Sequence, residues 1–219
     1  SLLNEELGLD DFSEFLEDET TMAKIENLMS IRDSFNNEKD WHEIAKSLAI
    51  FSAFTEGVNL FSSFAILLSF KMRNKLKGVG QIVEWSIRDE SMHSEAGCWL
   101  FRTLIKENPE LDTPDLKAAV TEAALLSLQL ELDFIEKVYE LGDLEGCSKE
   151  DLICFIKHRV NTKLGDLGYD PVVNGIDPNA LKRMKWFDSL SAGKQHTDFF
   201  ANRVTNYSKG THNWDESIF

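Results

Sequence analysis

The chain has 219 residues with 38 acidic and 23 basic side chains, which gives a net charge of −15. This balance excludes nucleic acid and an anionic membrane surface as partners, because both require a basic patch. The content of 42% hydrophobic and 28% charged residues is typical of a soluble globular domain. Three cysteines, Cys98, Cys147 and Cys154, form no C-x-x-C pair, so we expect neither a disulfide framework nor a thiolate zinc site and favour the reducing cytoplasm.

The beginning of the sequence has no basic segment followed by an apolar run, so no secretory signal is expected. The most apolar run covers residues 58–70 and contains Asn and Ser. It is shorter than the roughly twenty residues that span a bilayer. We therefore expect a buried helix there and no membrane association.

Apolar residues recur with helical spacing and no run of strict alternation is present, which predicts an all-α fold. In chain order we expect helices at residues 20–35, 39–76, 80–107, 114–141 and 149–164, and a short one near 179–184. Gly78 and Gly80 are expected to end the second helix, and Pro114 to open the fourth. Long helices with short connections predict an antiparallel bundle. We place this domain at 1–200, followed by a polar, flexible tail at 201–219.

Two of the predicted helices carry acids in an otherwise apolar stripe. Glu56 shares its helix face with other residues, among them Ala49, Ala53, Leu60 and Leu67. On the next helix Glu90 and His93 are three residues apart and share a face with Ile87 and Phe101. A buried carboxylate must be neutralised, paired or bound to a metal. Because the connection between the two helices is short, the sequence predicts one cation held by Glu56, Glu90 and His93.

A less specific interpretation stays open for each part of this pattern. Glu-x-x-His arises often by chance, and the stripe that contains Glu56 can be misplaced by a residue. The acidic runs elsewhere are expected to be solvated faces, and the remaining histidines are expected at the surface or in the tail. These are His42, His158, His196 and His212.

Several separated motifs resemble the small, radical-generating subunit of class I ribonucleotide reductase. "TEGVNLFSSFAILLSF" is similar to the family's helix with a metal-binding Glu, and "WSIRDESMHSEAG" to its R-D-E-x-x-H helix. "FDSLSAGKQHTDFFANRVTNYSKG" resembles the segment that leads into the tail, and "NWDESIF" resembles the acidic tip that ends in Phe. The motifs occur in the family's order and cover nearly the whole chain. The fold implied is a partial ferritin-like helical bundle.

The resemblance assigns roles to individual residues. Glu56, Glu90 and His93 match metal ligands of a di-iron or di-manganese centre, with iron favoured. Asp89 matches an acid that orients a histidine ligand and lies on the radical-transfer route, and Tyr207 matches the tail tyrosine that relays the radical. The tip matches the segment that docks on the large subunit, and it comprises Trp214, Asp215, Glu216, Ser217, Ile218 and Phe219.

Two departures from the family pattern stand out. The family's first ligand half, an acid and a Glu-x-x-His, and its radical tyrosine find no match, and Tyr139, Tyr169 and Tyr207 cannot fill the tyrosine's position. Ala201 also replaces the acid that usually follows the "FF" pair. We therefore expect half of a di-metal site in a chain that is inactive by itself, as a fragment of a longer product or as half of a split subunit.

The activity implied is that of the ribonucleoside-diphosphate reductase small subunit, an oxidoreductase that serves deoxyribonucleotide synthesis for DNA replication. The partners implied are the large subunit, a second copy in a homodimer, and a separate chain that supplies the missing half. Two alternatives stay open: another ferritin-like di-metal oxidase, which has no need of the tail, and a chemically inactive protein that only binds the large subunit.

Overall fold

The computed structural model describes residues 18–34, 40–140 and 142–191, and this part of the chain is helical, with no β-strand. Its elements are α3 (Glu19–Ser34), α4 (Trp41–Ile50), the π-helix η1 (Phe51–Thr55), α5 (Phe61–Met72), α6 (Lys77–Glu107), the 3-10 helix η2 (Pro109–Leu111), α7 (Pro114–Glu140), α8 (Lys149–Leu167), α9 (Pro178–Arg183) and α10 (Lys185–Ser191). The all-α prediction is confirmed. The predicted tail, 201–219, lies outside the described residues.

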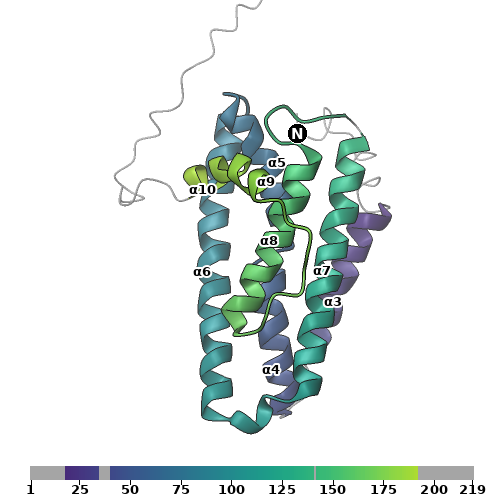
Figure 1. Ribbon diagram of the computed structural model, residues 1–219, viewed down its shortest axis with the longest axis vertical. Coiled ribbons are helices and arrows are strands. Elements are labelled where there is room, and N and C mark those ends of the chain that lie inside the picture. Colours follow the sequence, from purple (N-terminus) through teal and green to yellow (C-terminus); the bar gives the residue numbers. More distant parts are fainter. Residues whose placement is uncertain (1–17, 35–39, 141, 192–219) are drawn as a thin grey trace, which may run out of the picture.

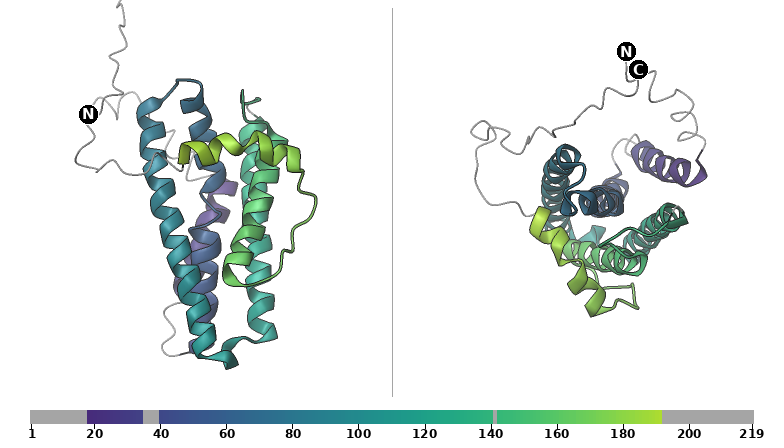
Figure 2. Two further views of the ribbon diagram at one scale, coloured as in Figure 1. Left: turned by 60° about the vertical axis from the view of Figure 1, so that its left-hand side comes forward. Right: turned by 90° about the horizontal axis from the view of Figure 1, so that it is seen from above.

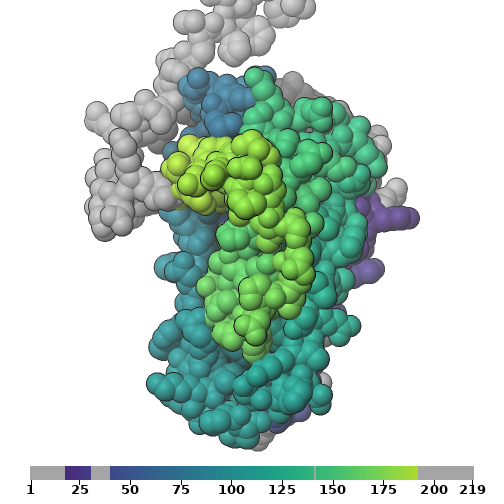
Figure 3. Space-filling view, in the orientation of Figure 1, coloured from purple at the N-terminus to yellow at the C-terminus, as the bar shows by residue number. Residues whose placement is uncertain are grey.

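The long helices lie along one axis and form a bundle (Figure 1). α6 packs against α4, η1 and α5 on one side and against α8 on another, while α7 packs against α8 and α4. α3 lies against α7 and α4, and the view from above places it beside α7 (Figure 2). The short helix α9 packs against α8, and α10 lies across α6 (Figure 3).

The predicted continuous helix at 39–76 is wrong, because the chain there is divided into α4, η1 and α5. In η1 the backbone hydrogen bonds run from residue i+5 to residue i, as from the Glu56 amide to the Phe51 carbonyl. A turn at residues 56–60 then separates η1 from α5. Apolar periodicity persists through all three pieces, so the pattern alone gave no sign of the break.

The connection between α5 and α6 also differs from the prediction. Gly78 and Gly80 lie inside α6, and the turn is made by Asn74 and Leu76, whose φ angles are 61° and 46°. Left-handed backbone is uncommon for a residue with a side chain, and Asn tolerates it better than Leu. The glycines were therefore misread as turn residues. At Gly80 a Cβ would lie 2.6 Å from Lys71 Cδ, so this glycine allows α6 to pass close to α5.

Other helix ends agree with the sequence. Pro114 is the first residue of α7, and the Ser148 hydroxyl accepts a hydrogen bond from the Asp151 amide at the start of α8. α8 continues three residues beyond the prediction and ends at Gly168, whose φ of 91° suits a glycine C-cap. The short helix near 179–184 is present as α9, whereas α10 was not predicted.

Phe187 explains why the short α10 is held in place. Its ring is buried and contacts Phe155 of α8 and Phe61 of α5, with centroid distances of 4.9 and 6.2 Å. α9 is held separately, because the Arg183 guanidinium donates to both oxygens of the buried Asp151. These hydrogen bonds lower the pKa of Asp151. One aromatic anchor and one ion pair thus fix the two short helices on the bundle.

A second interior acid, Glu131 of α7, is fully buried and compensated by the protein itself. Lys24 of α3 forms an ion pair with Oε1, and the Ser62 hydroxyl of α5 donates to Oε2. Burial raises the pKa of Glu131, while Lys24 and Ser62 oppose that rise. Lys24 Nζ also donates to the Asn59 carbonyl at 3.2 Å. The pair therefore links α3, α5 and α7.

We expect Lys24→Met to destabilise the protein by about 3–5 kcal/mol, because it leaves the Glu131 carboxylate buried without its cation. The double variant Lys24→Met/Glu131→Leu should recover most of that loss. Urea denaturation measures both free energies of unfolding. Lys46→Met breaks a partly exposed pair with Glu43 and is the control, with an expected loss below about 1 kcal/mol. Equal losses in the two single variants would contradict this account of Glu131.

Candidate metal centre

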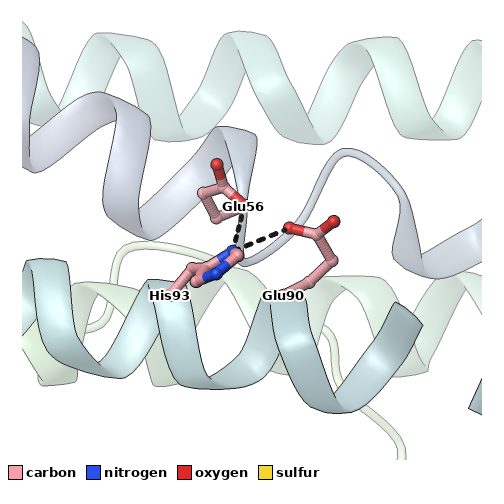
Figure 4. A group of neighbouring side chains, drawn as sticks. All are labelled: Glu56, Glu90 and His93. Carbon is pink, nitrogen blue, oxygen red and sulfur yellow. Dashed lines mark ion pairs between the residues drawn. The ribbon is translucent and has the colours of Figure 1, made fainter. Parts of the chain in front are cut away.

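Glu56, Glu90 and His93 meet in the structure as the sequence predicted. Each offers one ligand atom, and the three atoms lie within 4.8 Å of one another. His93 Nδ1 lies 3.8 Å from Glu56 Oε2 and 3.8 Å from Glu90 Oε2 (Figure 4). In the part of the chain that the structure describes, this is the one group of three or more His, Cys, Asp or Glu residues placed to hold a metal ion.

Two different local structures position these side chains. Glu90 and His93 are one turn apart on the regular helix α6. The buried residues of this helix include Ile87 and Phe101. Glu56 follows the last residue of η1. The wider π turn adds a residue to the helix, and π turns are frequent at functional sites. The extra residue changes the direction in which Glu56 points, so the π-helix contributes to its meeting with α6.

Close packing between η1 and α6 keeps the two parts together. A Cβ on Gly97 would lie 2.6 Å from the Cβ of Ser52, which is buried in η1. Gly97 lies one turn beyond His93 on α6. Glycine therefore permits the approach that brings Glu56 to His93.

The three candidate ligands Glu56, Glu90 and His93, here called the triad, differ in their exposure to solvent. The side chains of Glu56 and Glu90 are 17% and 24% exposed, whereas that of His93 is 57% exposed. Burial, and next the neighbouring Glu90, raises the pKa of Glu56 to about 7. Two neighbouring carboxylates repel each other when both are ionised. A cation bound between them would relieve this repulsion.

The other residues singled out in the sequence divide into two groups. Asp89 is exposed on α6, next to Glu90. Tyr207, Ala201 and the tip from Trp214 to Phe219 lie outside the described residues. Tyr139 lies within α7 and donates to the Cys147 carbonyl. Tyr169 lies just after α8, and its buried hydroxyl has no hydrogen-bond partner among the described residues. The roles assigned to Asp89 and Tyr207 stay predictions.

Sequence reasoning missed two cations of α8 that lie close to Gly57, the residue after Glu56. Arg159 donates to the Gly57 carbonyl, and Lys163 is buried with its Nζ 2.9 Å from Asp166 Oδ2. Both belong to "FIKHRVNTK", which has the composition of a solvated face. A signal was nevertheless present, because Arg159 and Lys163 interrupt the α8 stripe that includes Leu152 and Ile156. The same reasoning that selected Glu56 would have selected them.

The three side chains suit a first-row transition metal. Carboxylates bind iron and manganese well, and a neutral imidazole binds iron. Helical bundles that hold two such ions use a Glu from each of two helices and a Glu-x-x-His from each of the other two. The described residues supply one of each, so the donor set fits half of a di-metal centre. A helical bundle with such a donor set is the arrangement of the ferritin-like di-metal carboxylate proteins.

Sequence comparison identifies the family. Residues 1–179 match the family described as "Ribonucleotide reductase, small chain". The chain therefore belongs to the ribonucleotide reductase small-chain family.

Individual relatives agree with this assignment. The chain is 35% identical, over 81% of its length, to a protein named as a ribonucleoside-diphosphate reductase small subunit in Invertebrate iridescent virus 3, and covers 46% of that protein. It is 32% identical over 99% of its length to the corresponding protein of Invertebrate iridescent virus 6 and covers 69% of it. The chain thus spans about half of the first relative and about two thirds of the second.

Solved structures share the fold. The ribonucleotide reductase R2 subunit from Clostridium botulinum superposes with a TM-score of 0.69 at 21% identity, over 82% of this chain and 55% of that one. The dimanganese(II) NrdF of Streptococcus sanguinis gives 0.61 at 22% identity, over 80% and 60% of the two chains. The ferritin-like fold implied by the resemblance is confirmed. In the described residues no helix is long and apolar enough to cross a membrane.

We expect Gly97→Ala to destabilise the protein by about 1–3 kcal/mol, because the added methyl group forces α6 away from Ser52. Gly165→Ala in α8 is the matched control, since a Cβ there meets nothing within 4 Å. That control should be neutral or stabilise the protein by up to about 1 kcal/mol through helix propensity. Urea denaturation of both variants provides the measurement. A neutral Gly97→Ala would show that close packing at this point is unimportant.

Proposed function

We propose that this chain acts as part of a class I ribonucleoside-diphosphate reductase small subunit and contributes half of its di-metal site. The observation that carries the proposal is the meeting of Glu56, Glu90 and His93 inside a bundle of this family. Because the chain spans only part of its relatives, the activity requires a complete small subunit. By itself the chain is expected to be inactive.

Each ligand has a defined part in this proposal. Glu56 and Glu90 balance the charge of the cation, and His93 supplies a neutral nitrogen donor. The site takes a di-iron centre, with di-manganese as the close alternative, and the bound metal supplies the oxidising equivalent that starts radical chemistry. Asp89 is proposed to orient a histidine ligand and to lie on the radical-transfer route, and Tyr207 to relay the radical toward the large subunit.

The proposed partners follow from the same assignment. They are the large subunit, bound by the tip at residues 214–219, a second copy in a homodimer, and the polypeptide that supplies the other ligand half. The open side of the triad supports the last of these, because His93 is 57% exposed where further ligands would approach. Cys98, Cys147 and Cys154 are free thiols, which supports a cytoplasmic location.

The family assignment leaves the inactive interaction protein as the alternative to test. It would retain the fold and the tail but bind no metal at the triad. Binding of metal by the three named side chains distinguishes it from the proposed function.

The isolated chain is expected to bind Mn²⁺ weakly, and His93→Ala should reduce the affinity by roughly tenfold or more. Even residues that only orient a metal ligand contribute about 10–100-fold, so loss of a ligand should cost at least as much. The electron paramagnetic resonance signal of free Mn²⁺ during a titration measures binding. His158→Ala, an exposed histidine of α8, is the control and should bind as the wild type does. Equal affinity in all three proteins would remove the triad from the proposal.

The tail makes a separate prediction. A peptide ending in "NWDESIF" should compete with the chain for the large subunit, and removal of Ile218 and Phe219 should abolish the competition, because aromatic and aliphatic anchors concentrate binding energy. A peptide of the same composition in scrambled order is the control. Fluorescence anisotropy of the labelled peptide gives the affinities. If the trimmed peptide competes equally well, the docking role of the tip is wrong.

A further inference from the structure

The turn at residues 56–60 interrupts the hydrogen bonds of a continuous helix. In an α-helix the Phe61 amide would donate to the Gly57 carbonyl, but it donates to the Val58 carbonyl at 2.9 Å. The Val58 and Asn59 amides both donate to the Phe54 carbonyl, at 3.1 and 2.9 Å. The break therefore leaves the Gly57 carbonyl, next to the proposed ligand Glu56, without its helical donor.

Arg159 of α8 supplies the missing donor. Its Nε donates to the Gly57 carbonyl, and its guanidinium lies over the Phe61 ring, 3.1 Å from the ring centroid. The two contacts lie at either end of the turn. A planar guanidinium can make both at once, since it stacks on an aromatic face while its N–H groups point outward in the ring plane.

The position of Arg159 has no other electrostatic explanation among the described residues. No carboxylate there forms an ion pair with it, and Asp188 and Asp166 act on it only at longer range. Burial lowers the pKa of Arg159 to about 9, so the side chain stays charged at neutral pH. Burying a cation without an ion pair is costly, and a hydrogen bond to a carbonyl and an aromatic face offset part of that cost.

Two further side chains, those of Lys163 and Ser94, pack closely against Gly57. A Cβ there would lie 2.8 Å from Lys163 Cδ and 2.8 Å from Ser94 Oγ. Ser94 lies on α6 immediately after His93, and Lys163 lies one turn beyond Arg159 on α8. Residues from both helices therefore meet at the backbone that carries Glu56.

We propose that Arg159 is a positioning residue for the metal site: by binding the Gly57 carbonyl it holds the turn at residues 56–60 so that Glu56 faces Glu90 and His93. This inference rests on the proposed metal-binding function of the triad. It assigns a role to a residue of α8, a helix that contributes none of the three ligands.

The test compares Arg159→Met with Arg102→Met in the full chain. Arg102 also joins two helices through a backbone carbonyl, that of Asp166, but it lies away from the triad. Hydrogen exchange of the amides at 58–61 and the Mn²⁺ titration are measured for both variants, with urea denaturation to compare their stability. Arg159→Met should accelerate exchange at 58–61 and weaken Mn²⁺ binding by about tenfold, the lower end of the effect of a residue that orients a ligand. Arg102→Met should change neither.

A conservative variant covers the case in which Arg159→Met does not fold. Arg159→Lys keeps the charge and a donor but loses the planar stacking on Phe61, so its exchange and its affinity should fall between those of the wild type and Arg159→Met. Wild-type values for Arg159→Lys would then overturn the inference. So would equal effects of Arg159→Met and Arg102→Met, or faster exchange with unchanged Mn²⁺ affinity.

Failure of the proposed function is distinguishable from failure of the inference. If the wild type binds no Mn²⁺, the proposed metal site is wrong in this chain. The exchange comparison then decides alone whether Arg159 holds the turn: acceleration at 58–61 in Arg159→Met only supports that role, and its absence refutes it.

Discussion

A carboxylate placed between packed helices needs a compensating charge, and the arrangement of this bundle depends on that requirement. Two interior acids meet it in different ways. Glu131 has its compensation within the chain, from Lys24 and the Ser62 hydroxyl. Glu56 has a second carboxylate, Glu90, as its neighbour, and its pKa is raised to about 7. The interactions of Glu131 stabilise the fold. The pair of carboxylates at Glu56 and Glu90 instead favours the binding of a cation from solution.

The backbone around Glu56 reflects the same requirement. A regular helix from 41 to 72 would give its carbonyls helical donors throughout, yet the chain here forms a π turn followed by an irregular turn. The carbonyl left over at Gly57 accepts from Arg159, and the close contacts of Gly57 and Gly97 hold the segment between α6 and α8. Irregular backbone, small residues and a half-buried arginine thus occur together at one place, beside the proposed ligands.

Much of the fold and the triad could be predicted from the sequence because both depend on local spacing. The helix α6, its buried face and the pair Glu90 and His93 follow from a three-residue interval on one element. Glu56 was identified by its apolar neighbours, although Leu60 of the same predicted stripe is 41% exposed. Leu60 lies in the irregular turn that follows η1, and no apolar pattern encodes that turn. Arg159 interrupts an apolar stripe of α8 and could have been selected in the same way, but its partner, a backbone carbonyl 102 residues away, could not be inferred from the sequence.

The π turn also makes the position of Glu56 sensitive to the length of the chain. Each residue of an α-helix turns the next by about 100°, whereas the wider π turn of η1 holds one residue more, so the number of residues in η1 affects the direction in which Glu56 points. In genetic terms, the loss of a single codon within Phe51–Thr55 would remove the π turn on which the position of Glu56 depends, while every ligand stays encoded. A sequence alignment that ignores a one-residue gap in this segment would still align Glu56 with a glutamate. It would not show that the two side chains lie at different places in space.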